Sequence, residues 1–127
     1  MLGAMVVWLV AGPAAPAAET SGSGSATADK LDFSRDVRPI LSGYCFKCHG
    51  PDDVARKARL RLDIREAAIN PAKSGARAIV PGQPDQSELV ARIFATDEDD
   101  LMPPVAAKHP LTPAQKEILT RGIAAGA

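Results

Sequence analysis

The 127-residue sequence has few aromatic side chains, only 4% of the total, and no excess of charge, with 15 Lys and Arg against 15 Asp and Glu. Proteins that bind nucleic acid electrostatically need a clustered basic excess, so no nucleic-acid partner is expected. A chain of this length provides one small domain with a thin apolar core. With eleven prolines and ten glycines, it cannot form an uninterrupted helix bundle. Long loops are therefore expected, with something besides apolar packing holding them together.

The N-terminal segment has the composition of a secretion signal. The first 18 residues contain no charged side chain, and Met1 to Ala11 is almost wholly apolar. The small residues of Ala15-Pro16-Ala17 predict a signal peptide over residues 1–17, with cleavage after Ala17 or, alternatively, Ala18. The alternative is an uncleaved anchor, but glycine and proline shorten the usable apolar helix to about a dozen residues, too few to span a bilayer. The protein is therefore expected in the periplasm or an equivalent exported space, with no stable membrane span after cleavage.

The composition then changes to serine, glycine, threonine and alanine across residues 18–31. Such a segment cannot bury apolar surface, so it is predicted to be a flexible linker. The remaining residues, 32–127, are predicted to form the single folded domain.

Both cysteines and one of the two histidines fall within five consecutive positions, as Cys45, Cys48 and His49 in the pattern C-x-x-C-H. On a helix, positions i, i+3 and i+4 share one face, so all three side chains are expected to project the same way. This pattern indicates covalent haem attachment: the two thiols add to the vinyl groups of the haem, and the His49 imidazole binds the iron.

Three other interpretations of these residues are weaker. A zinc site needs four ligands, and only the distant His109 could add a nitrogen. A redox-active disulfide of the thioredoxin type follows a buried strand, whereas the segment before Cys45 has a helical pattern. A structural disulfide between Cys45 and Cys48 would close a loop too short to constrain the chain.

The second axial ligand of such an iron is expected to be Met102, the one methionine that remains after removal of the signal peptide. It precedes Pro103 and Pro104, whose fixed φ angles restrict the loop and help a weak iron–sulfur bond persist. The alternatives are that Met102 fills a gap in the core, or that His109 is the ligand. Ligation by His49 and Met102 leaves no open position for a substrate, so it indicates an electron carrier rather than an enzyme.

Capping residues and helical spacing predict about three helices. They run from Asp32 or Ser34 to Tyr44, from Asp85 or Ser87 to Phe94, and from Thr112 through Ile123. The third begins with a capping box formed by Thr112 and Gln115. In the first, Pro39 is tolerable only within the first turn. Gly122 costs stability inside a helix, so a close crossing against the first helix is expected there.

The middle of the chain is basic, with Arg56, Lys57, Arg59, Arg61 and Arg65. One interpretation is a solvated charged face. The other is that Arg59 or Arg61 pairs with a haem propionate, and strand-like alternation would place both on one side.

The ring nitrogen of His49 that does not bind iron is expected to donate to a backbone carbonyl. The loop Val80-Pro81-Gly82 is the candidate supplier.

Several segments, in this order, resemble the planctomycete-type cytochrome c domain. They are Phe33 to Leu41, Cys45 to Asp52, Leu60 to Asp63, Val80 to Pro84, and Leu101 to Pro104. The resemblance covers residues 32–127, and it implies an all-α, cytochrome c-like fold with long loops around one covalent haem c. The resemblance implies Trp-Ile at the place where this chain has Gly122-Ile123, so the aromatic side chain expected beside the haem there is missing.

The resemblance also bears on partners. Such a domain usually opens a much longer exported protein, so the partner is either a separate redox protein or downstream domains of the same polypeptide. The first function expected is free one-electron transfer, and the alternative is the N-terminal redox module of a larger exported enzyme. A third interpretation, of another class, is a haem enzyme or gas sensor with an open iron position.

Overall fold

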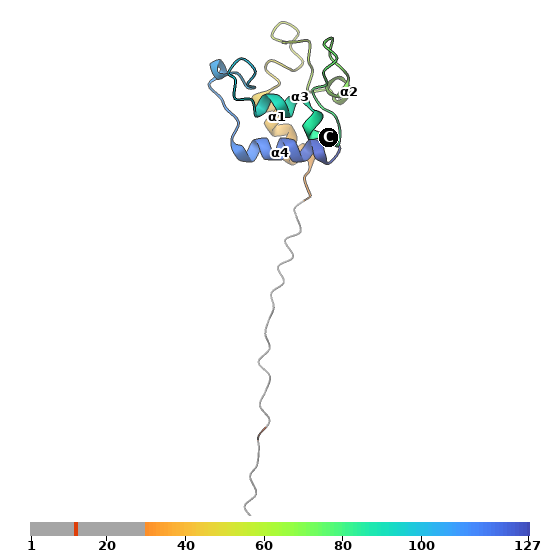
Figure 1. The fold of residues 1–127 in the computed structure, drawn as a ribbon, viewed down its shortest axis with the longest axis vertical. Coiled ribbons are helices and arrows are strands. Elements are labelled where there is room, and N and C mark those ends of the chain that lie inside the picture. Colours follow the sequence, from red (N-terminus) through yellow and green to blue (C-terminus); the bar gives the residue numbers. More distant parts are fainter. Residues whose placement is uncertain (1–11, 13–29) are drawn as a thin grey trace, which may run out of the picture.

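The computed structural model describes Gly12 and residues 30–127. Apart from Gly12, the predicted signal peptide lies outside the described residues, as does most of the predicted linker. The elements are η1 (Phe33–Val37), α1 (Arg38–Tyr44), α2 (Arg65–Ile69), η2 (Pro84–Gln86), α3 (Glu88–Ile93), η3 (Val105–Ala107) and α4 (Pro113–Ala124). Within the described part of the chain no strand forms, and a single isolated bridge pairs Pro71 with Arg77. The predicted all-α fold with long loops is confirmed (Figure 1).

The first helix begins at Asp32 and consists of two parts. The Asp32 carboxylate accepts a hydrogen bond from the Arg35 N–H at 2.8 Å, which confirms Asp32 as the cap. The opening segment η1 is a wider π-helical turn, and α1 continues from it without a break. Pro39 therefore lies in the first turn of α1 but well inside the continuous helical run. Its missing N–H and bulky ring are accommodated because the preceding turn is wider than an α-helical one.

The second expected helix, α3, begins after Ser87 and ends one residue before Phe94. Ser87 occupies the cap position, but its side chain does not cap the helix. Its hydroxyl donates to the Gln83 carbonyl at 3.0 Å and accepts from the Val80 N–H at 2.9 Å. The serine is 2% exposed, so it joins the preceding loop to α3 from inside the protein.

The third expected helix, α4, has the predicted capping box. The Gln115 N–H donates to the Thr112 hydroxyl at 3.2 Å, and the Thr112 N–H donates to the Gln115 side chain at 2.9 Å. Two features lie beyond the expectation of three helices: the short helix α2, and the 3-10 turns η2 and η3.

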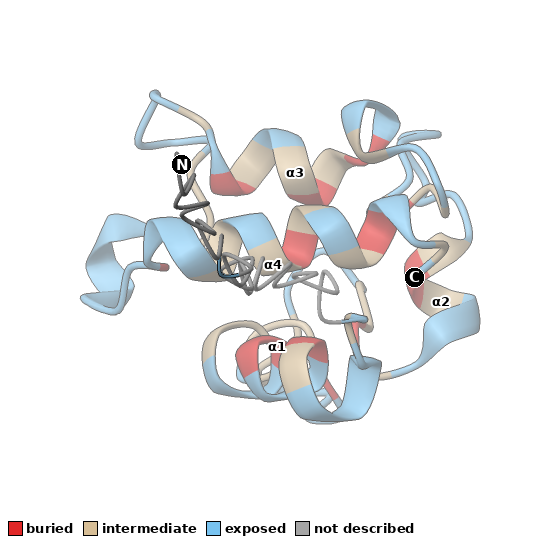
Figure 2. Cartoon of the chain, turned by 90° about the horizontal axis from the view of Figure 1, so that it is seen from below, coloured by how far each residue is buried: buried red, intermediate tan, exposed pale blue. Residues whose placement is uncertain are grey.

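Helix α4 is the central element, and it contacts η1, α3 and η2. Figure 2 shows it between α3 and α1. A Cβ atom added at Gly122 would lie 3.0 Å from a methyl group of Val37, so the helix backbones approach closely at this point. The predicted crossing of the third helix against the first is confirmed.

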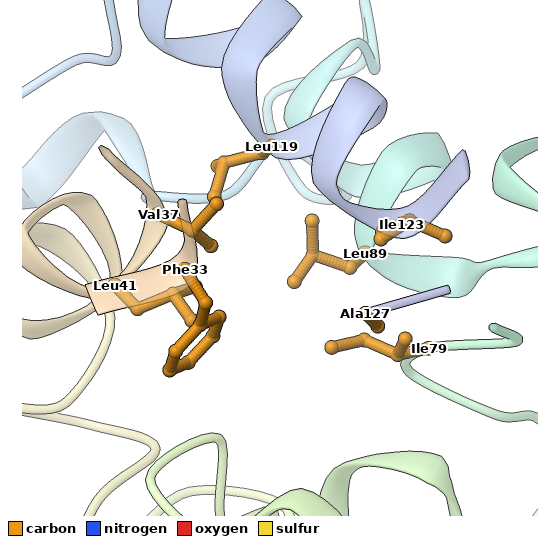
Figure 3. Close-up of a pocket in the computed structure, with 8 residues that line it drawn as sticks. All are labelled: Phe33, Val37, Leu41, Ile79, Leu89, Leu119, Ile123 and Ala127. Carbon is orange, nitrogen blue, oxygen red and sulfur yellow. The ribbon is translucent and has the colours of Figure 1, made fainter. Parts of the chain in front are cut away.

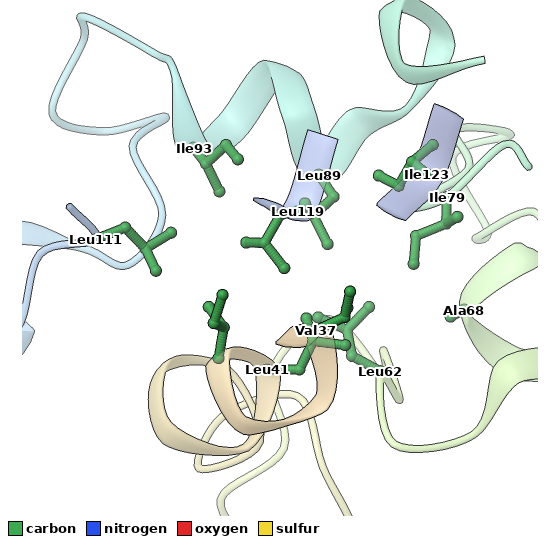
Figure 4. Close-up of a cluster of buried hydrophobic side chains, with 11 residues drawn as sticks. Val37, Leu41, Leu62, Ala68, Ile79, Leu89, Ile93, Leu111, Leu119 and Ile123 are labelled. Carbon is green, nitrogen blue, oxygen red and sulfur yellow. The ribbon is translucent and has the colours of Figure 1, made fainter. Parts of the chain in front are cut away.

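The core is one apolar cluster to which η1, the four α-helices and the loops between them contribute. Its buried members are Val37, Ile40, Leu41, Leu62, Ala68, Ile79, Leu89, Ile93, Leu111, Leu119 and Ile123. The side chains from α3 and α4 point toward those from η1 and α1 (Figure 4). Leu31, which the sequence prediction places at the end of the linker, packs half-buried against this cluster.

A small pocket of about 30 Å³ lies beside the core. All of its lining residues are apolar, and they include Phe33 and the C-terminal Ala127 (Figure 3). A space of this size accommodates about one water molecule.

Candidate functional site

Cys45, Cys48 and His49 lie in one tight turn at the end of α1. Cys45 is the residue that caps the helix after Tyr44. The His49 N–H donates to the Cys45 carbonyl at 2.8 Å, and the Cys48 N–H donates to the same oxygen at 3.1 Å. The segment is thus a helical turn rather than a continued helix, yet it keeps the i, i+4 spacing that the sequence predicts. Both cysteines carry free thiols and are half-buried.

Burial shifts the pKa values of Cys45 and His49. Burial, and secondarily the neighbouring Cys48, raise the pKa of the Cys45 thiol to about 11, so this thiol is protonated at neutral pH. Burial also lowers the pKa of His49, and a hydrogen bond to the Lys57 carbonyl opposes this in part. A neutral imidazole is the form that binds a metal ion.

The carbonyl beside His49 belongs to Lys57, 3.3 Å from Nδ1. The predicted supplier, the loop Val80-Pro81-Gly82, is therefore wrong. That loop is bound elsewhere, because the Gly82 N–H donates to the Ile123 carbonyl at 2.7 Å. With a proton on Nδ1, the lone pair of Nε2 is free to bind iron.

Residues 50–62, here termed the proximal loop, fold back onto the cysteine turn. The Lys57 N–H donates to the Cys48 carbonyl at 2.7 Å, and the Leu62 N–H donates to the His49 carbonyl at 2.8 Å. The loop therefore closes beside the histidine, which explains why a residue so near in sequence supplies the carbonyl.

Gly50 marks the tightest point of this closure. It is buried, and a Cβ atom there would lie 2.2 Å from the carbonyl oxygen of Phe46. No side chain fits at this position without moving the backbone. The Cβ position is fixed by the main chain of residue 50, and the atom that it meets is a main-chain carbonyl oxygen.

Met102 lies in a separate segment, residues 95–111, here termed the distal loop. Its side chain is half-buried, and its N–H donates to the carbonyl of Arg92 in α3 at 3.0 Å. The structure thus brings together the three residues of the C-x-x-C-H pattern, and holds Met102 through a different helix.

His109, the rival ligand, has another contact. Its ring stacks on Tyr44 with centroids 4.1 Å apart and planes 7° from parallel. The Tyr44 hydroxyl accepts a hydrogen bond from the Gln115 side chain at 3.0 Å. This stack fastens the distal loop to the residue before Cys45, and it favours Met102 over His109 as the ligand.

The two arginines proposed for a propionate differ in their surroundings. Arg61 pairs with Asp63 through two hydrogen bonds, of 3.1 and 2.5 Å, and this pairing lowers the pKa of Asp63. Arg59 is exposed, and it forms no ion pair with any residue that the structure describes. Ala58 and Arg59 have φ angles of 52° and 55° in the left-handed region, so the segment is not uniformly extended. The strand-like alternation expected for Arg59 and Arg61 is therefore wrong.

The described residues hold neither a cluster of metal-binding side chains nor a membrane-spanning helix. Residues 30–127 contain no group of three or more His, Cys, Asp or Glu side chains arranged to hold a metal ion. Among the helices of the same region, none has the length and apolarity required to cross a bilayer.

Comparison with known proteins identifies the class of this domain. The family model described as planctomycete cytochrome C matches residues 45–105, a span that begins at Cys45 and includes His49 and Met102. No curated protein and no solved structure matches the chain. The turn that holds Cys45, Cys48 and His49 thus lies in a cytochrome c domain, a class that carries covalent haem c and is typically extracytoplasmic. More particularly, residues 45–105 match the planctomycete cytochrome c family.

The residues present fit this cofactor. Two free thiols on one turn and a neutral imidazole with Nε2 available make up the donor set for covalent attachment and proximal ligation. The sequence motif alone was sufficient to find these three residues. The Lys57 carbonyl was missed, because its position depends on how the proximal loop closes.

Proposed function

We propose that this domain is a one-electron carrier with one haem c per chain, held by Cys45 and Cys48, with His49 and Met102 as axial ligands. The observation that supports this best is the hydrogen bond at 3.3 Å between His49 Nδ1 and the Lys57 carbonyl. It orients the imidazole and leaves Nε2 for the iron, the arrangement that a proximal histidine requires.

The chain's own groups have distinct roles in this proposal. When bound, the haem supplies the one-electron oxidation and reduction. Cys45 and Cys48 fix its position, His49 binds through a neutral nitrogen, and the soft sulfur of Met102 favours the reduced state. Two protein ligands leave no position for a substrate, which is why we propose a carrier rather than an enzyme or gas sensor.

The haem propionates also need a cationic partner. We assign this role to Arg59, because the guanidinium of Arg61 already binds Asp63. Arginine binds carboxylates in a two-point geometry, so an exposed guanidinium within the proximal loop suits this role.

The place of action and the partner belong to the same proposal. We place the domain in the periplasm or an equivalent exported space, following the signal peptide expected over residues 1–17. Its partner is a separate redox protein or further domains of the same polypeptide. Both partners exchange one electron at a time, so the choice between them does not alter the roles of the ligands.

Attachment is tested by denaturing mass spectrometry of the protein coproduced with haem-maturation enzymes. The chain is expected to carry the mass of one haem, and Cys45→Ala/Cys48→Ala is expected to carry none. A wild-type chain without added mass and with two thiols open to alkylation would refute the proposal.

Distal ligation is tested by the ferric absorption spectrum. Met102→Ala is expected to abolish the sulfur-to-iron charge-transfer band and to convert low-spin iron to high-spin iron. His109→Phe is the matched control, because it removes the rival nitrogen and retains an aromatic ring against Tyr44. A charge-transfer band that survives in Met102→Ala would rule out Met102 as the ligand.

A further inference from the structure

We infer that Arg56 is a positioning residue for His49: its guanidinium closes the proximal loop so that the Lys57 carbonyl meets Nδ1 of the imidazole. This inference rests on the proposed function, since it concerns the orientation of the proximal ligand. Arg56 belongs to the basic segment whose side chains the sequence suggests are solvated or bound to haem.

Arg56 instead makes contacts inside the loop. Its Nε donates to the Gly50 carbonyl at 2.9 Å, and its Nη2 donates to the Pro51 carbonyl at 3.0 Å. The same Nη2 lies 2.6 Å from a carboxylate oxygen of Asp53. The Arg56 side chain is 17% exposed, whereas that of Asp53 is 85% exposed. The arginine is thus an internal cross-link, with an ion pair at its outer edge.

The cross-link joins the beginning of the loop to its middle. Gly50 and Pro51 directly follow His49, and Arg56 directly precedes Lys57. The Lys57 N–H donates to the Cys48 carbonyl at 2.7 Å, and its carbonyl lies 3.3 Å from His49 Nδ1. With both ends of residues 50–57 held in this way, the peptide that bears the Lys57 carbonyl has little freedom to move away from the imidazole.

The geometry calls for a guanidinium rather than a simple cation. Two carbonyls of consecutive residues accept from two nitrogens of one planar group, and arginine presents its donors in a fixed fork. Lysine has the same charge but a single nitrogen on a flexible stem. Arg56→Lys therefore keeps the electrostatic effect on the iron and loses the fork, which separates positioning from charge.

The experiment follows the Nδ1 proton of His49 in the holoprotein. The chain has only two histidines, so labelling histidine with nitrogen-15 gives a simple spectrum. In the ferrous protein, Arg56→Lys is expected to accelerate exchange of this proton with solvent by about tenfold, the change that losing one net hydrogen bond gives. Arg65→Lys is the matched control, because its guanidinium also donates to two backbone carbonyls, those of Ala127 and Gly126, but lies outside the proximal loop, and it should exchange at the wild-type rate.

The outcomes distinguish this inference from the proposed function. A wild-type exchange rate in Arg56→Lys overturns the inference. Ferric protein in which His49 shows no paramagnetic shift overturns the proposed ligation itself. If Arg56→Lys does not accumulate as holoprotein, Asp53→Asn serves as the test: losing an exposed ion pair to Arg56 should accelerate exchange about twofold. An unchanged rate in Asp53→Asn then overturns the inference.

Discussion

The two sides of the site are held in different ways. On the proximal side, the cysteine turn and the proximal loop are joined by main-chain hydrogen bonds at Cys48 and His49 and by the cross-link of Arg56. On the distal side, Met102 is tied to α3 by one main-chain hydrogen bond, and the loop beyond it is held by the Tyr44–His109 stack. The proximal side is an internally bonded unit, whereas the distal loop depends on separate contacts with other elements.

This difference indicates how the two proposed ligands, His49 and Met102, respond to disturbance. Each contact of the distal loop is of a kind that contributes about 1 kcal/mol or less. We therefore expect that weakening the distal loop detaches Met102 before the domain unfolds, while damage to the proximal loop destabilises the whole domain.

The largest effect is expected from Gly50→Ala. The added methyl group would meet the Phe46 carbonyl oxygen at 2.2 Å, so the loop must shift. We expect the free energy of unfolding of the holoprotein to fall by about 3 kcal/mol, the upper range for inserting a carbon into a closely packed site. A titration with guanidinium chloride, monitored by circular dichroism, measures this free energy of unfolding.

Gly43→Ala is the matched control for this substitution. Gly43 lies in α1, and no atom lies within 4 Å of an added Cβ there. Alanine favours a helix by up to about 1 kcal/mol over glycine, so this variant should be slightly more stable. A Gly50→Ala protein as stable as the wild type would show that the proximal loop is not tightly closed.

A smaller and more local effect is expected from His109→Ala. Loss of the ring stack removes about 1 kcal/mol from the attachment of the distal loop. The denaturant concentration at which the sulfur-to-iron band disappears should fall, while the midpoint of global unfolding changes less. The absorbance of the sulfur-to-iron band and the circular dichroism signal are recorded in the same denaturant titration. His109→Phe, which retains a ring, should behave like the wild type, and equal loss in both variants would argue against the stack.

The smallest effect is expected from Asp100→Asn. Asp100 pairs with Arg92 at 2.7 Å, but their side chains are 61% and 37% exposed, so the pair is worth a few tenths of a kcal/mol. At low salt, the denaturant concentration at which the sulfur-to-iron band disappears should be slightly lower than in the wild type. At about 1 M salt, where such pairs are screened, the two proteins should lose the band at the same concentration. Glu98→Gln removes a charge from the same turn and serves as the control. A difference that persists at high salt would mean that Asp100 acts through something other than charge.

The features that were predicted from the sequence depend on neighbouring residues. The cap at Asp32 and the capping box at Thr112 follow from spacings of three residues. The close crossing at Gly122 was predicted because glycine inside a helix needs a compensating contact. The C-x-x-C-H turn was found for the same reason, since its ligands lie within one turn.

The features that were missed depend on closure of the loops. The Lys57 carbonyl lies beside His49 in a loop where Ala58 and Arg59 take left-handed conformations, for which neither residue type gives a signal. The same bend removes the alternation expected for Arg59 and Arg61. Helix α2 is five residues long, too short for helical periodicity to stand out. Ser87 was placed correctly as a cap position, but its buried hydroxyl serves the preceding loop.

The proximal loop also bears on the timing of haem maturation. Its hydrogen bonds join residues no more than 13 positions apart, such as His49 and Leu62, whereas the crossing of Val37 with Gly122 joins distant parts of the chain. Bringing together nearby segments costs less chain entropy than bringing together remote ones. The loop beside the two thiols is thus held mainly by contacts that are near in sequence, so its closure does not need to wait for the C-terminal helix.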